Sequence, residues 1–294
     1  MKIAIAVLTW NRLPALQQIL KGFEAHCSQY RQAVFEDAGT KDDTAQSLLS
    51  NAQSVPGFKS QYLATYFKIA GGVEVFLGNE NLGVAGNSNR ALRWFIQETD
   101  CDYLCLCNDD LIIKGDFAAF YAEAWTKLKI GLFCYCGFTS KMYAWDPEHV
   151  NGYVIKKLGR MTGAMMAMPR ELIDRIGFFD MRFGKFGEEH VDFTNRARLA
   201  GYQQVRNKPQ LCLDLKNDLL EHLEVPSTMV GREKAEAEAV ASQGIKSIDY
   251  AADGIYRPYR LFTKVRVAGV DGDGISDKVL GGYYDVGARQ VIIR

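Results

Sequence analysis

The sequence predicts an α/β fold, in which a mostly parallel sheet is covered by helices on both faces. Short apolar runs alternate along the chain with longer segments whose apolar positions recur at helical spacing. This alternation is typical of parallel sheets, because parallel neighbours need a crossover connection and that connection is usually a helix. Polar turns follow several of the apolar runs, and ligands of such sheets bind beyond the carboxyl ends of the strands.

Each predicted strand is a short apolar run bounded by turn residues. The predicted strands cover residues 2–10, 33–36, 72–77, 102–107, 131–137 and 161–168. One helix is predicted to begin near Pro14, because the first helical turn tolerates proline. The other predicted helices cover residues 44–53, 87–99, 117–128, 169–176 and 189–200. Between them, the Gly- and Asn-rich residues 79–86 are predicted to form a loop.

The pattern changes near residue 225. We expect residues 1–225 to form one domain and residues 226–294 a small C-terminal appendage. In the appendage, a charged and Ala-rich helix is predicted over 231–243, and strand-like alternation over 257–270 and 279–293. The Asp-Gly-Asp-Gly run at 271–274 lacks the third acidic ligand and the closing Glu of a calcium loop, so a turn is predicted.

The bulk composition excludes several classes of function. The chain has 294 residues, of which 48% are hydrophobic, and 35 basic residues balance 35 acidic ones. Nucleic-acid binders usually carry a basic excess, so no nucleic-acid partner is expected. No apolar run reaches the roughly 18–20 residues of a membrane span, and the N-terminal run resembles a buried strand more than a signal peptide. Peripheral membrane contact stays open.

Seven cysteines at irregular spacing argue against a disulfide framework. Two C-x-C pairs, Cys105 with Cys107 and Cys134 with Cys136, lie in predicted strands, where both members of a pair share a face. A zinc site is conceivable, but free cysteine commonly behaves as a small buried hydrophobe, so core positions are predicted. Free thiols favour a reducing compartment, and a cytoplasmic location is expected.

Two acidic segments indicate a metal-assisted active site. Glu188, Glu189, His190 and Asp192 lie at the start of the last predicted helix. A helix N-terminus favours negative charge, but three carboxylates and a histidine within five residues exceed what capping needs. The second segment, Asn-Asp-Asp at 108–110, follows a predicted strand and so lies at the edge where ligands bind.

In their order and spacing, these segments resemble the GT-A glycosyltransferases, specifically glycosyltransferase family 2, over roughly residues 1–225. The matching segments are Leu-Thr-Trp-Asn-Arg at 8–12, Glu-Asp-Ala-Gly-Thr-Lys-Asp-Asp-Thr at 36–44 with one residue more than the family pattern, the Asn/Gly run at 79–91, Asn-Asp-Asp at 108–110, Thr-Gly-Ala at 162–164, Gly-Phe-Phe-Asp at 177–180 and Glu-His-Val-Asp at 189–192. The resemblance implies a GT-A fold. It also implies metal-assisted transfer of a sugar from a nucleotide-diphosphate sugar to a glycan or other hydroxyl acceptor, with inversion by direct displacement.

The resemblance also implies a site for the donor nucleotide. Asp37 matches the position that commonly accepts a hydrogen bond from the base or the ribose. Arg12 is a candidate phosphate contact, since a guanidinium matches phosphate oxygens at two points, although a surface charge is the alternative. The asparagine-rich loop leads into a helix N-terminus, which suits a diphosphate but equally suits helix capping. The candidate donor-binding residues are Thr9, Asn11, Arg12, Asp37, Asn81, Gly83, Asn89, Asn108 and Asp109.

The divalent cation, Mn²⁺ or Mg²⁺, is expected on Asp110, because hard cations prefer carboxylate oxygens and bridge them to phosphates. Asn108 replaces the first Asp of the family pattern, which predicts modest metal affinity. His222 is the second candidate ligand, since the family often carries a histidine near this point that approaches the metal. A structural role is the alternative for His222.

The general base is left between two candidates. In the family an acidic pair supplies the base, and His190 replaces the second acid of that pair. Either Glu189 or Glu188 takes the proton while His190 bonds the acceptor, or His190 is itself the base, which we favour because imidazole exchanges protons near neutral pH. Asp192 is expected to orient a neighbour, and Arg196 to pair on its own helix.

Two other functions are compatible with this fold. A nucleotidyltransferase usually has a Gly-rich loop with a basic residue right after the first strand, and residues 9–14 contain no glycine. A non-catalytic protein that binds nucleotide sugars is the other alternative, because Asn108 and His190 both depart from the family pattern.

Overall fold

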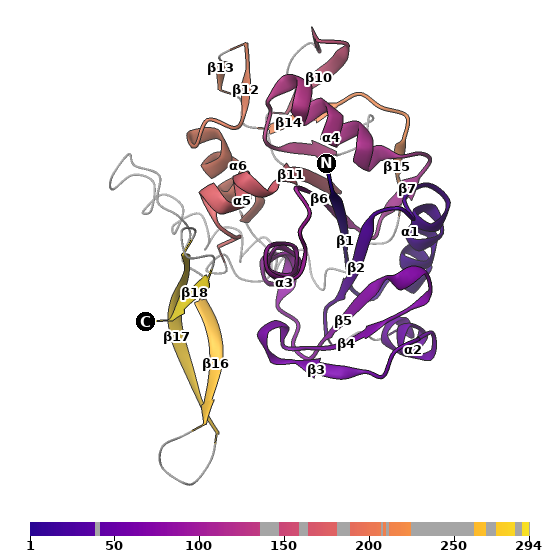
Figure 1. The fold of residues 1–294 in the computed structure, drawn as a ribbon, viewed down its shortest axis with the longest axis vertical. Helices are drawn as coiled ribbons and strands as arrows, with labels where there is room; N and C mark the ends of the chain where they lie inside the picture. Colours follow the sequence, from indigo (N-terminus) through magenta and orange to yellow (C-terminus); the bar gives the residue numbers. More distant parts are fainter. Residues whose placement is uncertain are drawn as a thin grey trace.

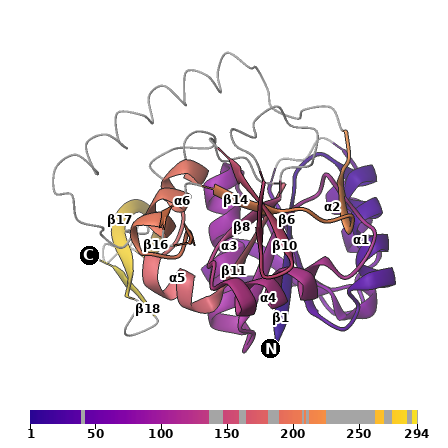
Figure 2. The same ribbon diagram turned by 90° about the horizontal axis from the view of Figure 1, so that it is seen from above.

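An eight-stranded sheet forms the centre of the computed structural model, with strand order β3-β4-β5-β2-β1-β6-β11-β8 (Figure 1, with β8 labelled in Figure 2). The structure describes residues 1–38, 42–135, 147–158, 164–180, 189–206, 208–209 and 212–224, and three strands after residue 261. The sheet strands are β1 (Ile3–Thr9), β2 (Arg31–Glu36), β3 (Gly57–Lys59), β4 (Ala64–Lys68), β5 (Glu74–Gly78), β6 (Tyr103–Asn108), β8 (Phe133–Tyr135) and β11 (Met165–Pro169).

The sheet is mostly parallel, as the sequence predicts. Strands β5, β2, β1 and β6 pair parallel in the middle, whereas β4 and β11 are antiparallel to their neighbours. Strands β3 and β8 run with the central four, because each pairs antiparallel with β4 or β11. Six of these eight strands therefore share one direction, and the carboxyl ends of the central strands meet at one edge.

Helices cover both faces of the sheet (Figure 2). They are α1 (Leu13–His26), α2 (Thr44–Ser50), α3 (Gly83–Glu98), α4 (Phe117–Leu128), α5 (Arg170–Ile176) and α6 (Glu189–Leu199). Buried side chains of α1, α2 and α4 belong to one hydrophobic cluster, and those of α3, α5 and α6 to the other. Both faces of β1 are buried, which explains its unbroken apolar sequence.

The two faces of β1 differ in residue size. Ile5 and Val7 contact the cluster that contains α1, whereas Ala4 and Ala6 face the cluster that contains α3. Small side chains on that face leave room for the aromatic side chains of α3, of which Trp94 is 0% exposed. Close packing of this kind fixes how far each helix stands from the sheet.

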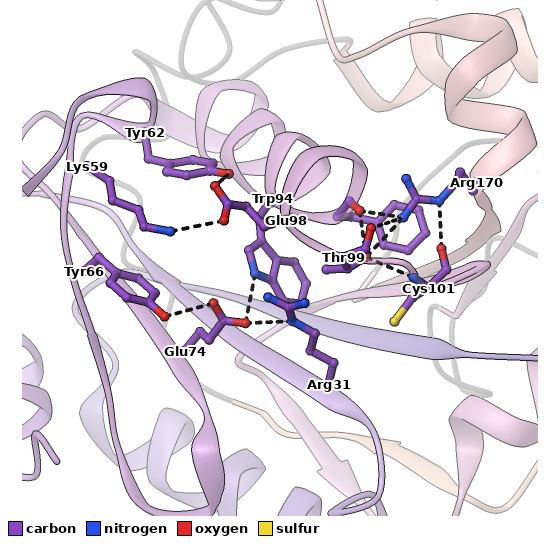
Figure 3. A network of polar contacts seen from close by, with 11 residues as sticks. Arg31, Lys59, Tyr62, Tyr66, Glu74, Trp94, Glu98, Thr99, Cys101 and Arg170 are labelled. Atoms are coloured by element: carbon purple, nitrogen blue, oxygen red, sulfur yellow. Dashed lines mark hydrogen bonds and ion pairs between the residues drawn. The ribbon is translucent and has the colours of Figure 1, made fainter. Parts of the chain in front are cut away.

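A polar network joins α3 to the amino edge of the sheet (Figure 3). The carboxylate of Glu74, at the start of β5, accepts hydrogen bonds from Nε of Arg31 at 2.8 Å, the hydroxyl of Tyr66 at 3.2 Å and Nε1 of Trp94 at 3.3 Å. Because Glu74 is buried, these three donors offset the cost of removing its charge from water.

The carboxyl end of α3 is capped by Arg170, the first residue of α5 (Figure 3). Its guanidinium donates hydrogen bonds to the backbone carbonyl oxygens of Phe95, Ile96, Thr99 and Cys101. Helix ends leave carbonyls without helical partners, and a cation is favourable there. Arg170 thus fixes the far end of a helix whose other end reaches the predicted site.

The sequence misses several short strands and one helix start. Helix α3 begins at Gly83, so the loop predicted over 79–86 is wrong for its second half, and α2 ends at Ser50 instead of 53. The unpredicted strands are β3, β4, β7 (Leu111–Ile113), β9 (Glu148–Val150), β10 (Tyr153–Leu158), β12 (Gln204–Val205), β13 (Lys208–Pro209), β14 (Cys212–Leu215) and β15 (Leu220–His222). Seven of these nine strands have only two to four residues, too few to show alternation, and β4 and β10 mix polar residues with apolar ones.

Beyond residue 225, three antiparallel strands form a sheet of their own. They are β16 (Phe262–Ala268), β17 (Ile275–Asp285) and β18 (Gln290–Ile293), in that order, which confirms the strand-like character predicted there. The helix predicted over 231–243 and the turn predicted over 271–274 lie outside the described residues. The domain boundary near 225 stays a prediction.

The core positions predicted for cysteine are confirmed for the described residues. Cys105, Cys107 and Cys134 are buried, as are the three other described cysteines, Cys27, Cys101 and Cys212. Burial raises the pKa of the Cys105 and Cys107 thiols well above the ordinary value, which opposes a thiolate metal site. Cys136 lies outside the described residues. None of the described helices combines the length and apolarity needed to cross a membrane.

Candidate functional site

The turns that follow β1 and β6 lie next to each other, because β1, β2 and β6 end level with one another. Thr9, the last residue of β1, pairs with Glu36 of β2, and Leu8 pairs with Asn108 of β6. Asn108 is also fixed by its backbone N–H, which donates to the carbonyl oxygen of Ala164 at 2.7 Å. The register thus brings the turn after β1 next to the turn after β6.

Asp109 ties these two turns together. Its Oδ2 accepts a hydrogen bond from the Thr9 hydroxyl at 2.7 Å, and its Oδ1 lies 3.1 Å from Nη1 of Arg12. The carboxylate is 2% exposed, and burial raises its pKa to about 6 against the opposing effects of Thr9 and Arg12. Between the two partners, Asn11 has a φ of 55°, a left-handed conformation that asparagine tolerates. Asp109 therefore shapes the turn that carries Arg12.

Asp110 and His222, the two predicted metal ligands, are brought together by a strand pair that the sequence did not predict. Strand β15 pairs with β7, which places His222 opposite Leu111, and the Leu223 N–H donates to the Asp110 carbonyl at 2.8 Å. Nε2 of His222 lies 3.7 Å from Oδ2 of Asp110, and the same oxygen is 3.2 Å from Nη1 of Arg12.

The chemistry of this pair fits a hard or borderline divalent cation. Oδ1 of Asp110 is buried and has no hydrogen-bond partner among the described residues, so a carboxylate oxygen is left with unused capacity. Carboxylate oxygen and imidazole nitrogen are both ligands of first-row divalent metals. The described part of the chain holds no group of three or more His, Cys, Asp or Glu side chains that could bind a metal. Asp110 and His222 would therefore leave coordination positions of a cation open to ligands other than the described side chains.

Asp37 lies at the start of α3, with both carboxylate oxygens engaged. Oδ1 accepts from Nη1 of Arg90 at 2.9 Å and from the Leu82 N–H at 3.0 Å, and Oδ2 accepts from the Gly83 N–H at 2.9 Å. Burial raises the pKa of Asp37, while Arg90 and the two backbone donors act in the opposite direction. The predicted contact with a base or ribose would add to these bonds, so it stays a prediction.

Gly83 begins α3 in a conformation that favours glycine. Its φ is +69°, in the left-handed region, and its N–H also lies 3.1 Å from Oδ1 of Asn81. The carboxylate of Asp37 and the amide of Asn81 cap the helix from outside it. Residues 83–86, which were predicted as part of the loop, therefore belong to the helix.

Asn89 connects α3 to the segment that precedes α6. Its Nδ2 donates to the carbonyl oxygen of Phe179 at 2.9 Å, and its Oδ1 accepts from the Phe179 N–H at 2.8 Å. Asn89 is 5% exposed. The structure therefore places this predicted donor-binding side chain in a structural clamp, and a ligand contact for it stays a prediction.

At the start of α6, Glu189 and His190 form a polar pair. Oε1 of Glu189 lies 3.1 Å from Nδ1 of His190, and the His190 ring meets the Phe179 ring edge-on with centroids 5.5 Å apart. The Glu189 side chain is 5% exposed and that of His190 is 23% exposed. Of the two, the imidazole is the group that solvent or a ligand can reach. Glu188 lies outside the described residues.

Asp192 faces along α6 toward Arg196. Its Oδ2 is 2.8 Å from Nη2 of that guanidinium, which confirms the expected ion pair within the helix. Arg196 also donates to the carbonyl oxygen of Phe178 at 2.7 Å. Through Arg196, Asp192 thus helps to fix the turn after α5, which carries Phe179.

Comparison with known proteins gives structural similarity alone. No family model matches the sequence, and no curated protein sequence matches it. The mannosyltransferase PcManGT from Pyrobaculum calidifontis, solved with GDP-Man and Mn²⁺, has a TM-score of 0.54 and 15% identity, covering 87% of this chain and 66% of that one. GalNAc-T7, solved with UDP, GalNAc and Mn²⁺, has a TM-score of 0.52 and 11% identity, covering 86% of this chain and 51% of that one.

The chain has the GT-A fold. At these identities the likeness establishes the fold, and this chain spans only about half to two thirds of the length of the two GT-A proteins. Within the GT-A sheet, Asp109, Asp110 and Arg12 all lie at the carboxyl ends of parallel strands, where such sheets bind ligands.

Two residues that organise this candidate site were not predicted from the sequence. Arg90, buried on α3, completes the bonding of Asp37. Phe179 joins Asn89 to His190 through its backbone and its ring. Arg90 follows Asn89 directly in the sequence, but its partner Asp37 lies just after β2, 53 residues earlier, and only the tertiary structure shows the pairing.

Proposed function

We propose that this protein is a metal-assisted glycosyltransferase, which moves a sugar from a nucleotide-diphosphate sugar to a hydroxyl acceptor. The observation that carries the proposal is the position of Asp110 and His222 beside Arg12, at the carboxyl edge of a GT-A sheet. A carboxylate, an imidazole and a guanidinium together suit a cation and a diphosphate. Mn²⁺ with GDP-Man or UDP in the two solved structures of similar fold supports the same chemistry.

Asp110 and His222 would hold the cation, Mn²⁺ or Mg²⁺. When bound, such a cation neutralises the negative charge that develops on a nucleoside diphosphate leaving group. Arg12 is placed to bind phosphate oxygens next to it. The start of α3 lies on the same edge, and the N–H groups of its first turn beyond Gly83, whose own N–H bonds Asp37, add a further anion-binding element. Thr9, Asn11 and Asn108 form the strand ends between these groups.

His190 is the proposed general base, and Glu189 is its positioning partner. With Nδ1 held by Oε1 of Glu189 at 3.1 Å, the imidazole would present Nε2 to the acceptor. The acceptor oxygen bonds to the anomeric carbon as its proton passes to Nε2. The bond from that carbon to the diphosphate oxygen breaks, and its electron pair leaves with the nucleoside diphosphate. Direct displacement of this kind inverts the anomeric centre.

A thermal-shift panel tests donor and metal binding. UDP-, GDP-, dTDP- and CMP-sugars are added with and without Mn²⁺ to the wild type, to Asp110→Ala and to the control Asp100→Ala, whose carboxylate is exposed beside Lys2. We expect one nucleotide class to stabilise the wild type and Asp100→Ala in a metal-dependent way, with the shift lost in Asp110→Ala. A panel with no shift for any donor would contradict the proposal, and binding without any turnover would favour a non-catalytic binder.

A further inference from the structure

Arg12 lies between the two carboxylates of the turn after β6. Its Nη1 is 3.1 Å from Oδ1 of Asp109 and 3.2 Å from Oδ2 of Asp110. The side chain is 19% exposed, and Nε is buried without a hydrogen-bond partner among the described residues. The guanidinium is thus held at one nitrogen, which leaves hydrogen-bonding capacity for another anion.

The oxygen of Asp110 that Arg12 contacts is also the one that faces His222. Oδ2 is 3.7 Å from Nε2 of the imidazole. A cation held by Asp110 and His222 would therefore share the Asp110 carboxylate with the guanidinium of Arg12. Arginine keeps its proton throughout the physiological range, so this positive charge stays in place. Repulsion between it and a dication weakens metal binding.

Two carboxylates and one guanidinium give the group formed by Arg12, Asp109 and Asp110 a formal charge of −1. A dication alone would turn that charge to +1 within a partly buried site. A nucleoside diphosphate restores the balance, because it brings negative charge and offers oxygens that match a guanidinium at two points. Divalent cations also bridge carboxylates to phosphates.

We propose that Arg12 competes with the divalent cation for Oδ2 of Asp110. The protein then binds metal weakly until the guanidinium of Arg12 binds a nucleoside diphosphate instead of Asp110. The inference rests on the proposed function, because it takes Asp110 and His222 as the metal ligands. Metal and nucleotide must then strengthen each other's binding by the same factor.

Titration calorimetry of the full chain with Mn²⁺, without nucleotide, tests the competition. The proteins compared are the wild type, Arg12→Gln and Arg31→Gln. Arg31→Gln removes the same charge at the opposite edge of the sheet, where Arg31 pairs with Glu74 (Figure 3). We expect Arg12→Gln to bind Mn²⁺ about tenfold more tightly than the wild type, within the range typical of coupled sites, and Arg31→Gln to match the wild type.

A second titration adds saturating GDP or UDP, with correction for Mn²⁺ bound by free nucleotide. We expect the nucleotide to tighten Mn²⁺ binding more in the wild type than in Arg12→Gln, while Arg12→Lys keeps the charge and follows the wild type. If Arg12→Gln does not fold, the test is the change in Mn²⁺ affinity of the wild type when nucleotide is added. Equal Mn²⁺ affinity with and without nucleotide overturns the inference.

Two further outcomes would contradict the inference in different ways. Equal or weaker Mn²⁺ binding by folded Arg12→Gln would overturn the competition and leave the proposed function standing. No Mn²⁺ binding by any of these proteins, even with either nucleotide, would overturn the proposed function itself and the inference with it.

Discussion

At the scale of single residues, Glu189 and His190 have different proposed roles. Glu189 positions the imidazole, and His190 accepts the proton of the acceptor. Glu189 is buried, and its Oε2 has no hydrogen-bond partner among the described residues, whereas His190 is partly exposed. A buried carboxylate beside an imidazole orients the ring by holding one of its nitrogens. This arrangement favours the imidazole as the proton acceptor, which is the alternative that the sequence already favoured.

Substitution at His190 tests this division. His190→Asn is expected to lower kcat by about 10²–10⁴-fold, the usual contribution of a general base, with little change in the KM for the donor. Glu189→Gln should lower kcat less and leave the pH profile in place, whereas His190→Asn should remove the acidic limb of that profile. The exposed His149 provides the control, His149→Asn. Loss of the acidic limb in Glu189→Gln alone would identify the carboxylate as the base.

Thiol reactivity gives a second prediction at this scale. Burial raises the pKa of Cys27 to about 12, and the pKa of Cys105 also rises well above its ordinary value. These thiols stay protonated in the folded protein at pH 8, and the thiolate is the reactive form. In a disulfide-exchange assay at pH 8, the six described cysteines should stay unreactive without denaturant and react in urea. Rapid reaction of Cys27 in the native protein would contradict this burial.

At the scale of elements, the start of helix α3 depends on a side chain from the turn after strand β2. Asp37 follows β2, yet it receives the first N–H groups of α3 and the guanidinium of Arg90. Because the cap comes from outside the helix, local sequence signals place the helix start four residues too late. The same buried pair sets the position of the helix terminus that faces the proposed donor.

Asp37→Asn is therefore expected to act mainly on stability. It leaves the buried Arg90 without its charged partner, which should lower the free energy of unfolding by about 3–5 kcal/mol. Urea unfolding measures this, with Asp100→Asn as a surface control. The double variant Asp37→Asn with Arg90→Met should be less destabilised than the two single effects combined. Unchanged stability with a raised donor KM would instead show that Asp37 binds the nucleotide.

At the scale of the whole molecule, sequence patterns predict what is local and apolar. Strands β1, β2 and β6 and helices α4 and α5 lie close to their predicted ranges, because buried runs and helical spacing are local signals. The pairing of β7 with β15 is different, since three-residue strands at 111–113 and 220–222 carry no such signal. Resemblance to a family indicated Asp110 and His222, but only the pairing shows why they meet. The engagement of Arg12 by two carboxylates was not predictable.

In the proposed function, the group around Asp110 and His222 supports metal-assisted sugar transfer. The most direct measurement is the rate of release of the nucleoside diphosphate from the donor that stabilises the protein, with Mn²⁺ and after its removal by EDTA. It should be made on the wild type, Asp110→Ala, His222→Ala and the control Asp100→Ala. We predict Mn²⁺-dependent release by the wild type and Asp100→Ala, which falls by about 10²-fold or more in Asp110→Ala and less in His222→Ala. A release rate that is unchanged in Asp110→Ala, or unchanged after EDTA treatment, would contradict the proposed function.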